Sequence, residues 1–490
     1  MDDESDMDTR KTMDCLEDLL KIPHYKGTDS QDVIEGYLRD ASNIKGHAEG
    51  LLRPECVEDV SCILKTCQDR NIPVTIAAQR TATTGSPVPF GGVVLSMENF
   101  DQIHSINEVD AGVVLGHYQQ HIEREGWLFP PDPTSRNECS IGGSIACNAS
   151  GARSFKYGAT RPWVEGLEVV FPNGETRQID RTTPIPSHWP RLNLSLPSVK
   201  TAAGYEPCTN LLDLMIGQEG TLGIITKAWL TTIPNPTVLG LLVFFDSNAD
   251  CLRAVHQLKW GAIRYSKGQT DIVHNAISPR VLEYFDRNSI GFMRAKLDDL
   301  PNATCGLFIE LESMSEVFAA LQPCLNILES CGALMEHSIL ADSEQGRNRL
   351  YQARHAIPAR INEIVIANGM PKVGTDFAVP DHRLEWMMDA YAEVDLPYVL
   401  FGHIGDNHLH LNMLPSTKTE LVYAKELYVE LARIALEYGG TVSAEHGIGK
   451  IKKQLLAEQV GVGVLEQYRL LKNVADPNWI LGRGTLFDRL

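Results

Sequence analysis

Three things are scarce or missing in this sequence, and each excludes a class of function. Basic residues are outnumbered 44 to 63 by acidic ones, which gives a formal net charge of -19 and argues against nucleic acid as the main partner. The 11 cysteines include no Cys-x-x-Cys pair, so we expect free or buried thiols in a reducing compartment and no iron–sulfur cluster on this chain. Apolar runs such as 241–245 are far too short to cross a bilayer. The acidic start, Met1 to Asp6, is unlike a signal or transit peptide, and we expect a cytoplasmic protein.

A hydrophobic content of 43% over 490 residues is enough for two or three domains with buried cores. In the first half, strands and helices follow one another at short range, as in α/β subdomains. Apolar periodicity predicts helices at 9–22 and after Arg53-Pro54, the second ending at Asn71-Ile72-Pro73. Turn residues and apolar patterns predict a hairpin at Asn173-Gly174 and strands at 74–78, 93–97, 111–116, 166–171 and within 220–233. Pro234-Asn235-Pro236 is a plausible domain boundary.

In the second half, strands and helices alternate, which predicts an α+β module built on an antiparallel sheet. We expect strands at 241–245, 307–312, 333–337, 398–402 and 408–414, and helices at 250–260, 315–330 and 419–438, with a further long helix after Pro380. Gly439-Gly440 is a natural end for the last of these helices.

Three segments are rich in glycine and hydroxyl residues where a chain would otherwise simply pack. They are Arg80 to Pro87, Pro130 to Gly151, and Gly217 to Gly223. Glycines let the backbone approach a ligand, and successive N–H groups form concavities that bind anions. None of the three is a Gly-x-Gly-x-x-Gly or Walker loop. One such segment is often an ordinary turn, but three in one module indicate a phosphate-bearing ligand.

In order and spacing, these segments resemble the FAD-binding domain of the vanillyl-alcohol-oxidase superfamily. The motifs that carry the likeness are Pro131-Asp132-Pro133, Ile141-Gly142-Gly143, Asn148 to Gly151, Tyr157-Gly158 and Gly220 to Gly223, with Asp476 to Leu481 and Gly484 to Phe487 as the closing segment. The likeness runs from about Arg53 to the C-terminus. It is closest to the branch of FAD-linked D-2-hydroxyacid dehydrogenases and oxidases, which includes glycolate oxidase and D-lactate and D-2-hydroxyglutarate dehydrogenases.

This resemblance implies an α+β fold, with a PCMH-type FAD-binding domain of two α/β subdomains and a ferredoxin-like antiparallel-sheet cap domain. The implied divisions are an N-terminal helical segment at 1–45, the FAD-binding domain at 46–236, the substrate or cap domain at 237–440 and a returning segment at 441–490. The residues implied to bind FAD are Arg80, Thr81, Thr83, Thr84, Gly85, Pro131, Asp132, Pro133, Ser140, Gly142, Gly143, Asn148, Gly151, Gly158, Glu219, Gly220, Gly223 and Ile225.

The first of these loops departs from the family, which usually has an arginine followed by several glycines. Threonines replace most of them here, and their hydroxyls could take over contacts to phosphate. The loop contains no histidine, so a covalent flavin link is not expected there. His104, His117 and His121 are alternative link positions, although surface histidines would look the same.

Two histidine-bearing segments lie in the last quarter of the chain, Phe401 to Asn412 and Ala444 to Gly449. A turn at 405–407 would fold the first into a hairpin and bring His403 and His410 into one site. Two imidazoles with the carboxylate of Glu445 form a common three-ligand set for a divalent metal, with zinc favoured over manganese and iron. The resemblance places these residues on metal-ligand positions, His446 on the catalytic base and Asn412 on a substrate contact. It implies asparagine at position 408, so His408 departs from the family pattern. His408 could be a metal ligand, a partner of a ligand or a surface residue, and of these we favour the surface residue.

A hydroxy acid also needs a cation for its carboxylate. The resemblance places Arg354 in that role, although a solvated arginine on a helix would look the same. Lys372 is a weaker candidate, since its spacing to Asp376 is not the one expected.

The implied reaction is metal-assisted oxidation of a D-2-hydroxy acid to the 2-oxo acid, with hydride transfer to FAD. The implied electron acceptor is a quinone, an electron-transfer flavoprotein, an iron–sulfur subunit or oxygen, and a homodimer stays open. Two alternatives remain: a flavin-dependent, non-redox transferase of the alkylglycerone-phosphate synthase type, and a non-catalytic flavoprotein subunit. The histidine and glutamate set argues against the first, and the intact His446 and Arg354 against the second.

Overall fold

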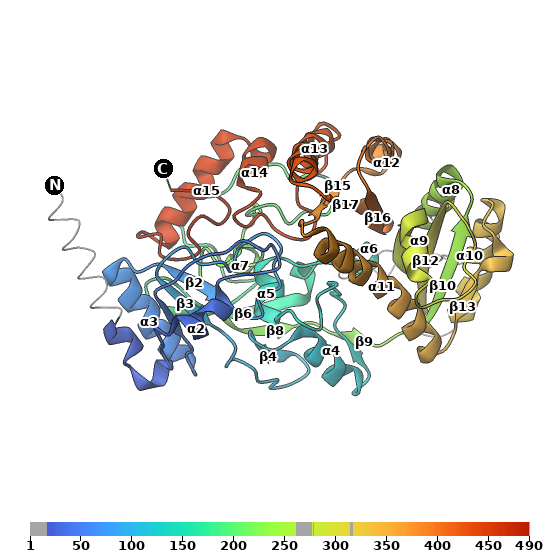
Figure 1. Ribbon diagram of the computed structural model, residues 1–490. Coiled ribbons are helices and arrows are strands. Elements are labelled where there is room, and N and C mark those ends of the chain that lie inside the picture. The colour runs from blue at the N-terminus through green and yellow to red at the C-terminus, as the bar shows by residue number, and fades with distance from the viewer. Residues whose placement is uncertain (1–16, 261–276, 278, 314–316, 490) are drawn as a thin grey trace.

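The computed structural model describes residues 17–260, 277, 279–313 and 317–489, and the structural statements below refer to these residues. It is a mixed α+β protein with one parallel sheet and a large antiparallel sheet, as the sequence predicts. Figure 1 shows the smaller sheets at the left and centre, the large sheet reaching to the right, and the C-terminal helices above them. None of the described helices is long and apolar enough to cross a membrane.

The N-terminal part forms a three-stranded parallel sheet in the order β1-β3-β2. Of the helix predicted at 9–22, residues 9–16 lie outside the described part of the chain, and 17–20 are helical. The elements are η1 (Pro23–Tyr25), α2 (Gln31–Ile34), η2 (Glu35–Tyr37), β1 (Gly50–Leu52), α3 (Val57–Arg70), β2 (Val74–Ala77) and β3 (Val93–Ser96). Helix α3 ends as predicted, because Asn71 takes a left-handed conformation with φ of 60° and donates its N–H to Cys67.

A four-stranded antiparallel sheet follows, in the order β4-β8-β6-β7. Its elements and their neighbours are β4 (Glu108–Asp110), α4 (Leu115–Glu123), β5 (Trp127–Leu128), α5 (Ile141–Ala146), α6 (Ser154–Tyr157), η3 (Arg161–Trp163), β6 (Val164–Val170), β7 (Thr176–Asp180), α7 (Leu211–Met215), β8 (Ile224–Leu230) and β9 (Ile233–Pro234). The hairpin predicted at Gly174 joins β6 to β7, with φ of +81°. The strand predicted at 111–116 is wrong, because the Gly112 N–H bonds to Phe100 and turns the chain out of the sheet.

The second half is built on an eight-stranded sheet in the order β13-β10-β12-β11-β16-β17-β14, with β15 pairing to β17. Its elements are β10 (Thr237–Phe245), α8 (Asn248–Trp260), β11 (Pro279–Asp286), α9 (Arg287–Met293), β12 (Cys305–Ser313), α10 (Val317–Ser330), η4 (Met335–His337), β13 (Ile339–Ala341), α11 (Glu344–Asn368), β14 (Val373–Gly374), β15 (Phe377–Ala378), η5 (Asp381–Arg383), α12 (Leu384–Ala392), β16 (Tyr398–His403), η6 (Ile404–Asp406), β17 (His408–Met413) and α13 (Lys418–Glu437).

Three expectations for this half need correction. The strand predicted at 333–337 is a 3-10 turn, and the strand follows it at Ile339–Ala341. The long helix expected after Pro380 has only 9 residues, whereas a helix of 25 residues, α11, lies before it. Strand β11 is not predicted, since buried charged residues interrupt its apolar pattern.

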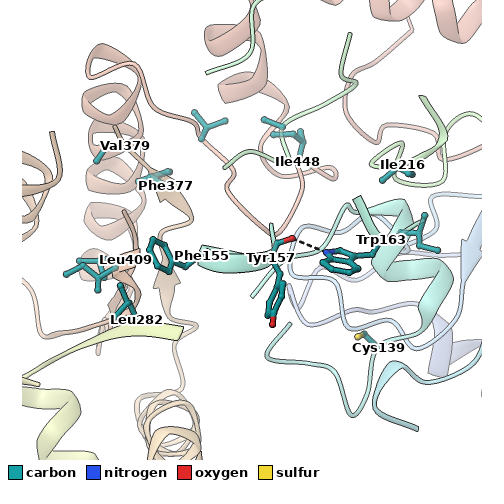
Figure 2. Close-up of a cluster of buried hydrophobic side chains, with 14 of the residues drawn as sticks. Cys139, Phe155, Tyr157, Trp163, Ile216, Leu282, Phe377, Val379, Leu409 and Ile448 are labelled. Atoms are coloured by element: carbon teal, nitrogen blue, oxygen red, sulfur yellow. Dashed lines mark hydrogen bonds between the residues drawn. The ribbon is translucent and has the colours of Figure 1, made fainter. Parts of the chain in front are cut away.

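The chain ends with two helices, α14 (Lys453–Val460) and α15 (Val462–Ala475), that return to the N-terminal half. Leu481 bridges to Val74 of β2, so the first and last parts of the molecule are joined. One continuous hydrophobic core runs from the four-stranded sheet into the large sheet. Figure 2 shows part of it, with Phe155 of α6 beside Leu282 and Leu409 of the large sheet.

Candidate functional site

The hairpin of β16 and β17 brings three histidines together. Its register places His403 opposite His408 and Phe401 opposite His410. The ring centroids of His408 and His410 are 4.3 Å apart, and each lies 5.6 Å from that of His403. The turn fits only a small residue at Gly405, because an added Cβ would lie 2.8 Å from the ring of Phe155. The predicted meeting of His403 and His410 is confirmed.

Glu445 reaches the same point from the loop after α13. Its Oε1 lies 3.3 Å from His403 Nε2, and its Oε2 lies 3.9 Å from His410 Nε2. Lys200 and Ser150 approach Oε1 at 2.7 and 3.1 Å from the other side. Burial opposes ionisation of this carboxyl, but His403 and Lys200 hold its pKa well below the usual range. The group is therefore a carboxylate and a good metal ligand.

Each histidine turns its other ring nitrogen toward an oxygen outside the cluster. His403 Nδ1 lies 2.6 Å from Glu283 Oε1, and His410 Nδ1 lies 3.1 Å from the carbonyl oxygen of Thr375. His408 Nε2 lies 3.1 Å from a carboxylate oxygen of Asp376. Metal-binding histidines are commonly oriented in this way by a carboxylate or carbonyl group.

These residues fit a divalent cation. One ligand atom each from His403, His408, His410 and Glu445 lie within 4.8 Å of one another. Burial lowers the pKa of His410 far below its ordinary value, with the neighbouring His408 adding to the shift, so this imidazole is neutral and able to bind a metal. Burial alone would also lower the pKa of His403, but the carboxylates of Glu445 and Glu283 raise it to about 9.

His408 is the clearest correction at the site. We expected a surface residue, and the side chain is fully buried, since β15 covers it through pairing of Ala378 with His408. The alternation along β17 does place it on the same face as His410, as the sequence indicates.

His446 stands at the open edge of this cluster. Its ring stacks on that of His410 at 5.5 Å, and its side chain is 38% exposed, so it can meet a substrate. Its Nδ1 lies 3.4 Å from Asp376 Oδ2. Burial lowers the pKa of His446 more than Asp376 raises it, which keeps the imidazole neutral near pH 7 and able to accept a proton.

Asp376 contacts several residues of the site, and sequence reasoning gave it no role of its own. It accepts N–H bonds from Glu445 and His446 at 3.1 and 3.0 Å, and Lys452 donates to it at 2.7 Å. Although burial opposes ionisation, His446 and Lys452 hold its pKa well below the usual range. The signal that could have found it is an aspartate directly before the apolar stretch that forms β15.

Arg354 and Asn412 lie beside the cluster with their polar groups already engaged. Arg354, on α11, donates through Nε and Nη2 to Glu283, which leaves Nη1 as the nitrogen that could meet a substrate carboxylate. Asn412 accepts from Lys372 Nζ at 2.7 Å and donates to the carbonyl of His410. The structure therefore brings Lys372, the weaker candidate for the clamp, next to the predicted substrate contact Asn412.

The three glycine-rich segments converge with the loop that carries His446. Glu219 and Gly217 donate their N–H groups to Ala146 and Ile145, which ties the third segment to the second. Ser86 of the first segment donates to the Glu219 carboxylate at 2.6 Å. Positive φ angles recur along these segments, at Arg80, Gly85, Asn148, Gly217, Glu219 and Gly220, and at the nearby Gly158. Several of their N–H groups are bonded within the protein, as Gly85 is to Asp40 and Gly217 to Ile145, so these bonds and the left-handed turns shape the loops.

Several residues expected to bind FAD through their side chains have other partners. Asp132 forms ion pairs with Arg136 and Arg153 at 2.9 and 3.4 Å, and Arg80 pairs with Glu98 at 2.9 Å. Ser140 caps helix α5 by accepting from the Gly143 N–H.

The remaining members of that set lie as follows. Thr84 is buried and bonds to the His446 carbonyl, Thr83 is exposed, Thr81 is half-buried, Ile225 packs in the core of β8, and Pro131, Pro133, Gly142, Gly151 and Gly223 lie in the loops or helix between the two sheets. Of the alternative flavin-link positions, His104 pairs with Asp110 at 2.8 Å and His121 with Glu125 at 3.8 Å. The ten described cysteines are free thiols.

Comparison with known protein families matches residues 48–180 to the family described as FAD binding domain, and residues 240–486 to FAD linked oxidases, C-terminal domain. The second match covers half of the chain. The chain belongs to the FAD-linked oxidases. The fold and the FAD cofactor predicted from the sequence are thereby confirmed, and this FAD-linked oxidase is an enzyme of the oxidoreductase class.

Curated relatives of this FAD-linked oxidase span nearly its whole length. It is 28% identical to a D-lactate dehydrogenase of Anaerostipes hadrus, over 98% of each chain. It is also 28% identical to a glycolate oxidase subunit of Bacillus subtilis, over 98% of this chain and 97% of the other. A D-2-hydroxyglutarate dehydrogenase of Xanthomonas citri is 28% identical over 89% and 88%. Among solved structures, an alkyldihydroxyacetonephosphate synthase superposes with a TM-score of 0.69 at 16% identity, over 96% of this chain and 84% of that one, which shows a shared fold.

Proposed function

We propose that this FAD-linked oxidase oxidises a D-2-hydroxy acid to the 2-oxo acid with the help of a divalent metal. The observation that carries the proposal is the convergence of His403, His410 and Glu445 beside the half-exposed His446. The relatives named for D-lactate, glycolate and D-2-hydroxyglutarate support the substrate class. The likeness to alkyldihydroxyacetonephosphate synthase is one of fold and does not favour the transferase alternative.

The protein residues divide the work of such a reaction. His446 takes the proton of the 2-hydroxyl group, and Asp376 holds its ring through the Nδ1 contact of 3.4 Å. Arg354, through Nη1, and Asn412 orient the substrate carboxylate. A bound divalent metal supplies Lewis-acid polarisation of the hydroxyl group. FAD supplies the acceptor for the hydride from C2.

Electrons must then leave the flavin, so the reaction needs a second partner. A quinone, an electron-transfer flavoprotein, an iron–sulfur subunit and oxygen are the chemical classes that accept electrons from reduced flavin. Any iron–sulfur relay would have to come from another chain, because the cysteines of this sequence are widely spaced and include no Cys-x-x-Cys pair.

The test is anaerobic bleaching of the flavin. Purified holoenzyme is mixed with D-lactate, glycolate or D-2-hydroxyglutarate, and the rate of flavin reduction is followed by absorbance. Replacing a general base typically costs about 10²- to 10⁴-fold, so His446→Ala should keep its flavin and lose flavin reduction by that factor.

A matched control is His337→Ala, which removes an imidazole that is 46% exposed on η4. It should reduce flavin at the wild-type rate. If His446→Ala bleaches as fast as this control with the best substrate, His446 is not the base. If none of the three acids bleaches the wild-type flavin, the substrate class is wrong.

A further inference from the structure

The buried imidazole of His408 is not used by the proposed reaction. Its backbone is fixed on both sides, by pairing with His403 on β16 and with Ala378 on β15. The side chain has no exposed surface. Its position is therefore set by strand register, and it cannot turn out to solvent without disrupting the sheet.

The inward-facing Nδ1 of His408 makes no hydrogen bond to the described residues, whereas Nε2 has the Asp376 carboxylate beside it. Leaving a buried polar group without a partner costs about 1–3 kcal/mol. A buried ring nitrogen held within a sheet therefore needs a partner, and a metal ion would supply it.

The ring is also oriented as a metal ligand would be. Its Nε2 faces Asp376 Oδ1 at 3.1 Å, so a proton on Nε2 would be held there and the lone pair would remain on Nδ1. Nδ1 faces inward, 3.7 Å from Glu445 Oε1. His403 and His410 turn their Nε2 atoms toward the same carboxylate.

We infer that His408 binds the metal through Nδ1 as a fourth protein ligand, so that the site consists of three histidines and one glutamate. This rests on the proposed function, which needs a metal at His403, His410 and Glu445. Metal–nitrogen and metal–oxygen bonds of about 2.0–2.2 Å allow donor atoms on opposite sides of one ion to be about 4.4 Å apart. The observed spread, within 4.8 Å for the four donors, is close to that limit.

A fourth protein ligand changes which metal suits the reaction. Catalytic zinc sites hold three protein ligands and keep a fourth position for water or substrate. Four protein ligands complete a tetrahedron, so the substrate would need a fifth and a sixth position. Manganese(II) and iron(II) accept that number readily. The site therefore favours a five- or six-coordinate ion of this kind over zinc, which was favoured from the sequence.

His446 is the competing imidazole, because it forms a second group of candidate donors with Asp376 and His410. Lys452, Ser443 and two backbone N–H groups already occupy the Asp376 carboxylate. Asp376 is therefore a poor ligand and a good orienting group, and His446 stays outside the metal site.

The inference is tested on the flavin-loaded protein after it has been stripped of metal and reloaded with Mn²⁺. Anomalous diffraction at the manganese edge locates the ion, and competition with a chelator gives its affinity in the wild type, in His408→Asn and in His446→Asn. We expect the ion within about 2.2 Å of His408 Nδ1. We expect His408→Asn to bind Mn²⁺ at least about 10-fold more weakly and His446→Asn to bind it as the wild type does.

The outcomes separate this inference from the proposed function. An ion held by His403, His410 and Glu445 with His408 Nδ1 out of bonding range overturns the inference and leaves metal-assisted oxidation intact. Equal Mn²⁺ affinity of wild type and His408→Asn overturns it as well. A wild-type protein that binds neither Mn²⁺ nor Zn²⁺ removes the metal from both proposals. Because the wild-type crystal alone decides the ligand set, the test does not depend on folding of the variants.

Discussion

Glu283 is the residue whose replacement tests the architecture around the histidines most sharply. It is fully buried on β11, and its Oε1 lies 2.6 Å from His403 Nδ1 and accepts from Arg354 Nη2 at 2.9 Å. Arg354 Nε donates to its other oxygen. Burial opposes the charge on Glu283, but Arg354 and His403 hold its pKa below the usual carboxyl range. One carboxylate thus orients both a metal ligand and the proposed substrate clamp.

In Glu283→Gln the amide has one acceptor oxygen and one NH₂ group. Whichever way it turns, a donor of His403 or Arg354 faces another donor, and the guanidinium stays buried without its counter-charge. Removing an outer partner of a metal-binding histidine typically weakens metal binding about 10- to 100-fold, which equals about 1.4–2.8 kcal/mol. Breaking a buried ion pair from one side adds about 3–5 kcal/mol of lost stability.

The matched control is Glu310→Gln on the neighbouring strand β12. Glu310 is equally buried and pairs with Arg280 at 2.7 Å, but it does not contact the histidines. Both variants should lower the thermal unfolding midpoint, followed by flavin fluorescence. Only Glu283→Gln should weaken Mn²⁺ binding in chelator competition. Equal metal affinity in the two variants would refute the argument that Glu283 acts through His403.

Two further predictions concern the flavin-side half of the molecule. Glu219 accepts hydrogen bonds from the N–H groups of Ile448 and Gly449 at 2.8 Å each. Glu219→Gln should therefore loosen the loop that carries His446 and slow flavin reduction about 10- to 100-fold, with Mn²⁺ affinity unchanged. Stopped-flow bleaching of the flavin measures the rate, and a wild-type rate in the variant would contradict this prediction. In Asp132→Asn, loss of the pairs to two arginines should cost about 3–5 kcal/mol at pH 7. Although burial opposes it, Arg153 and Arg136 lower the pKa of Asp132 below 3.8, so this stability is present above that pH and is lost as pH falls through the folded-state pKa. The difference in unfolding midpoint between wild type and Asp132→Asn should therefore disappear only below about pH 4. If it disappears near pH 6, the pH dependence of stability belongs to another group.

The features that sequence reasoning located correctly are those encoded over short distances. The turn at 405–407 and the alternation from His408 to Asn412 place His403 and His410 together, and the hairpin of β16 and β17 has that register. The turn at Gly174 and the end of α3 at Asn71 are likewise local, because a left-handed residue determines each.

What sequence reasoning missed depends on pairing between distant strands. Burial of His408 requires β15 to lie along β17, which no pattern within β17 indicates. Strand β11 was not predicted because Arg280 and Glu283 interrupt its apolar run, and these charges are tolerated only because Glu310 and Arg354 meet them from β12 and α11. A single sequence shows the cost of a buried charge but not the partner that offsets it.

The charges around the histidines are balanced without a metal, and this constrains the substrate. Four carboxylates of the pocket face three cations: Glu283 has Arg354, Asp376 has Lys452, and Glu445 and Asp406 share Lys200. Without a metal, His403 is protonated at pH 7 because its pKa is about 9, and it balances the fourth carboxylate. With all imidazoles neutral, as metal binding requires, the set carries one negative charge. A divalent ion would then leave an excess positive charge in a buried site, which is costly unless an anion accompanies it. The carboxylate of a hydroxy acid offsets that charge. An uncharged alcohol of the same size should therefore bind far more weakly to the metal-loaded enzyme than the acid, and flavin bleaching with lactate compared with propane-1,2-diol measures the difference.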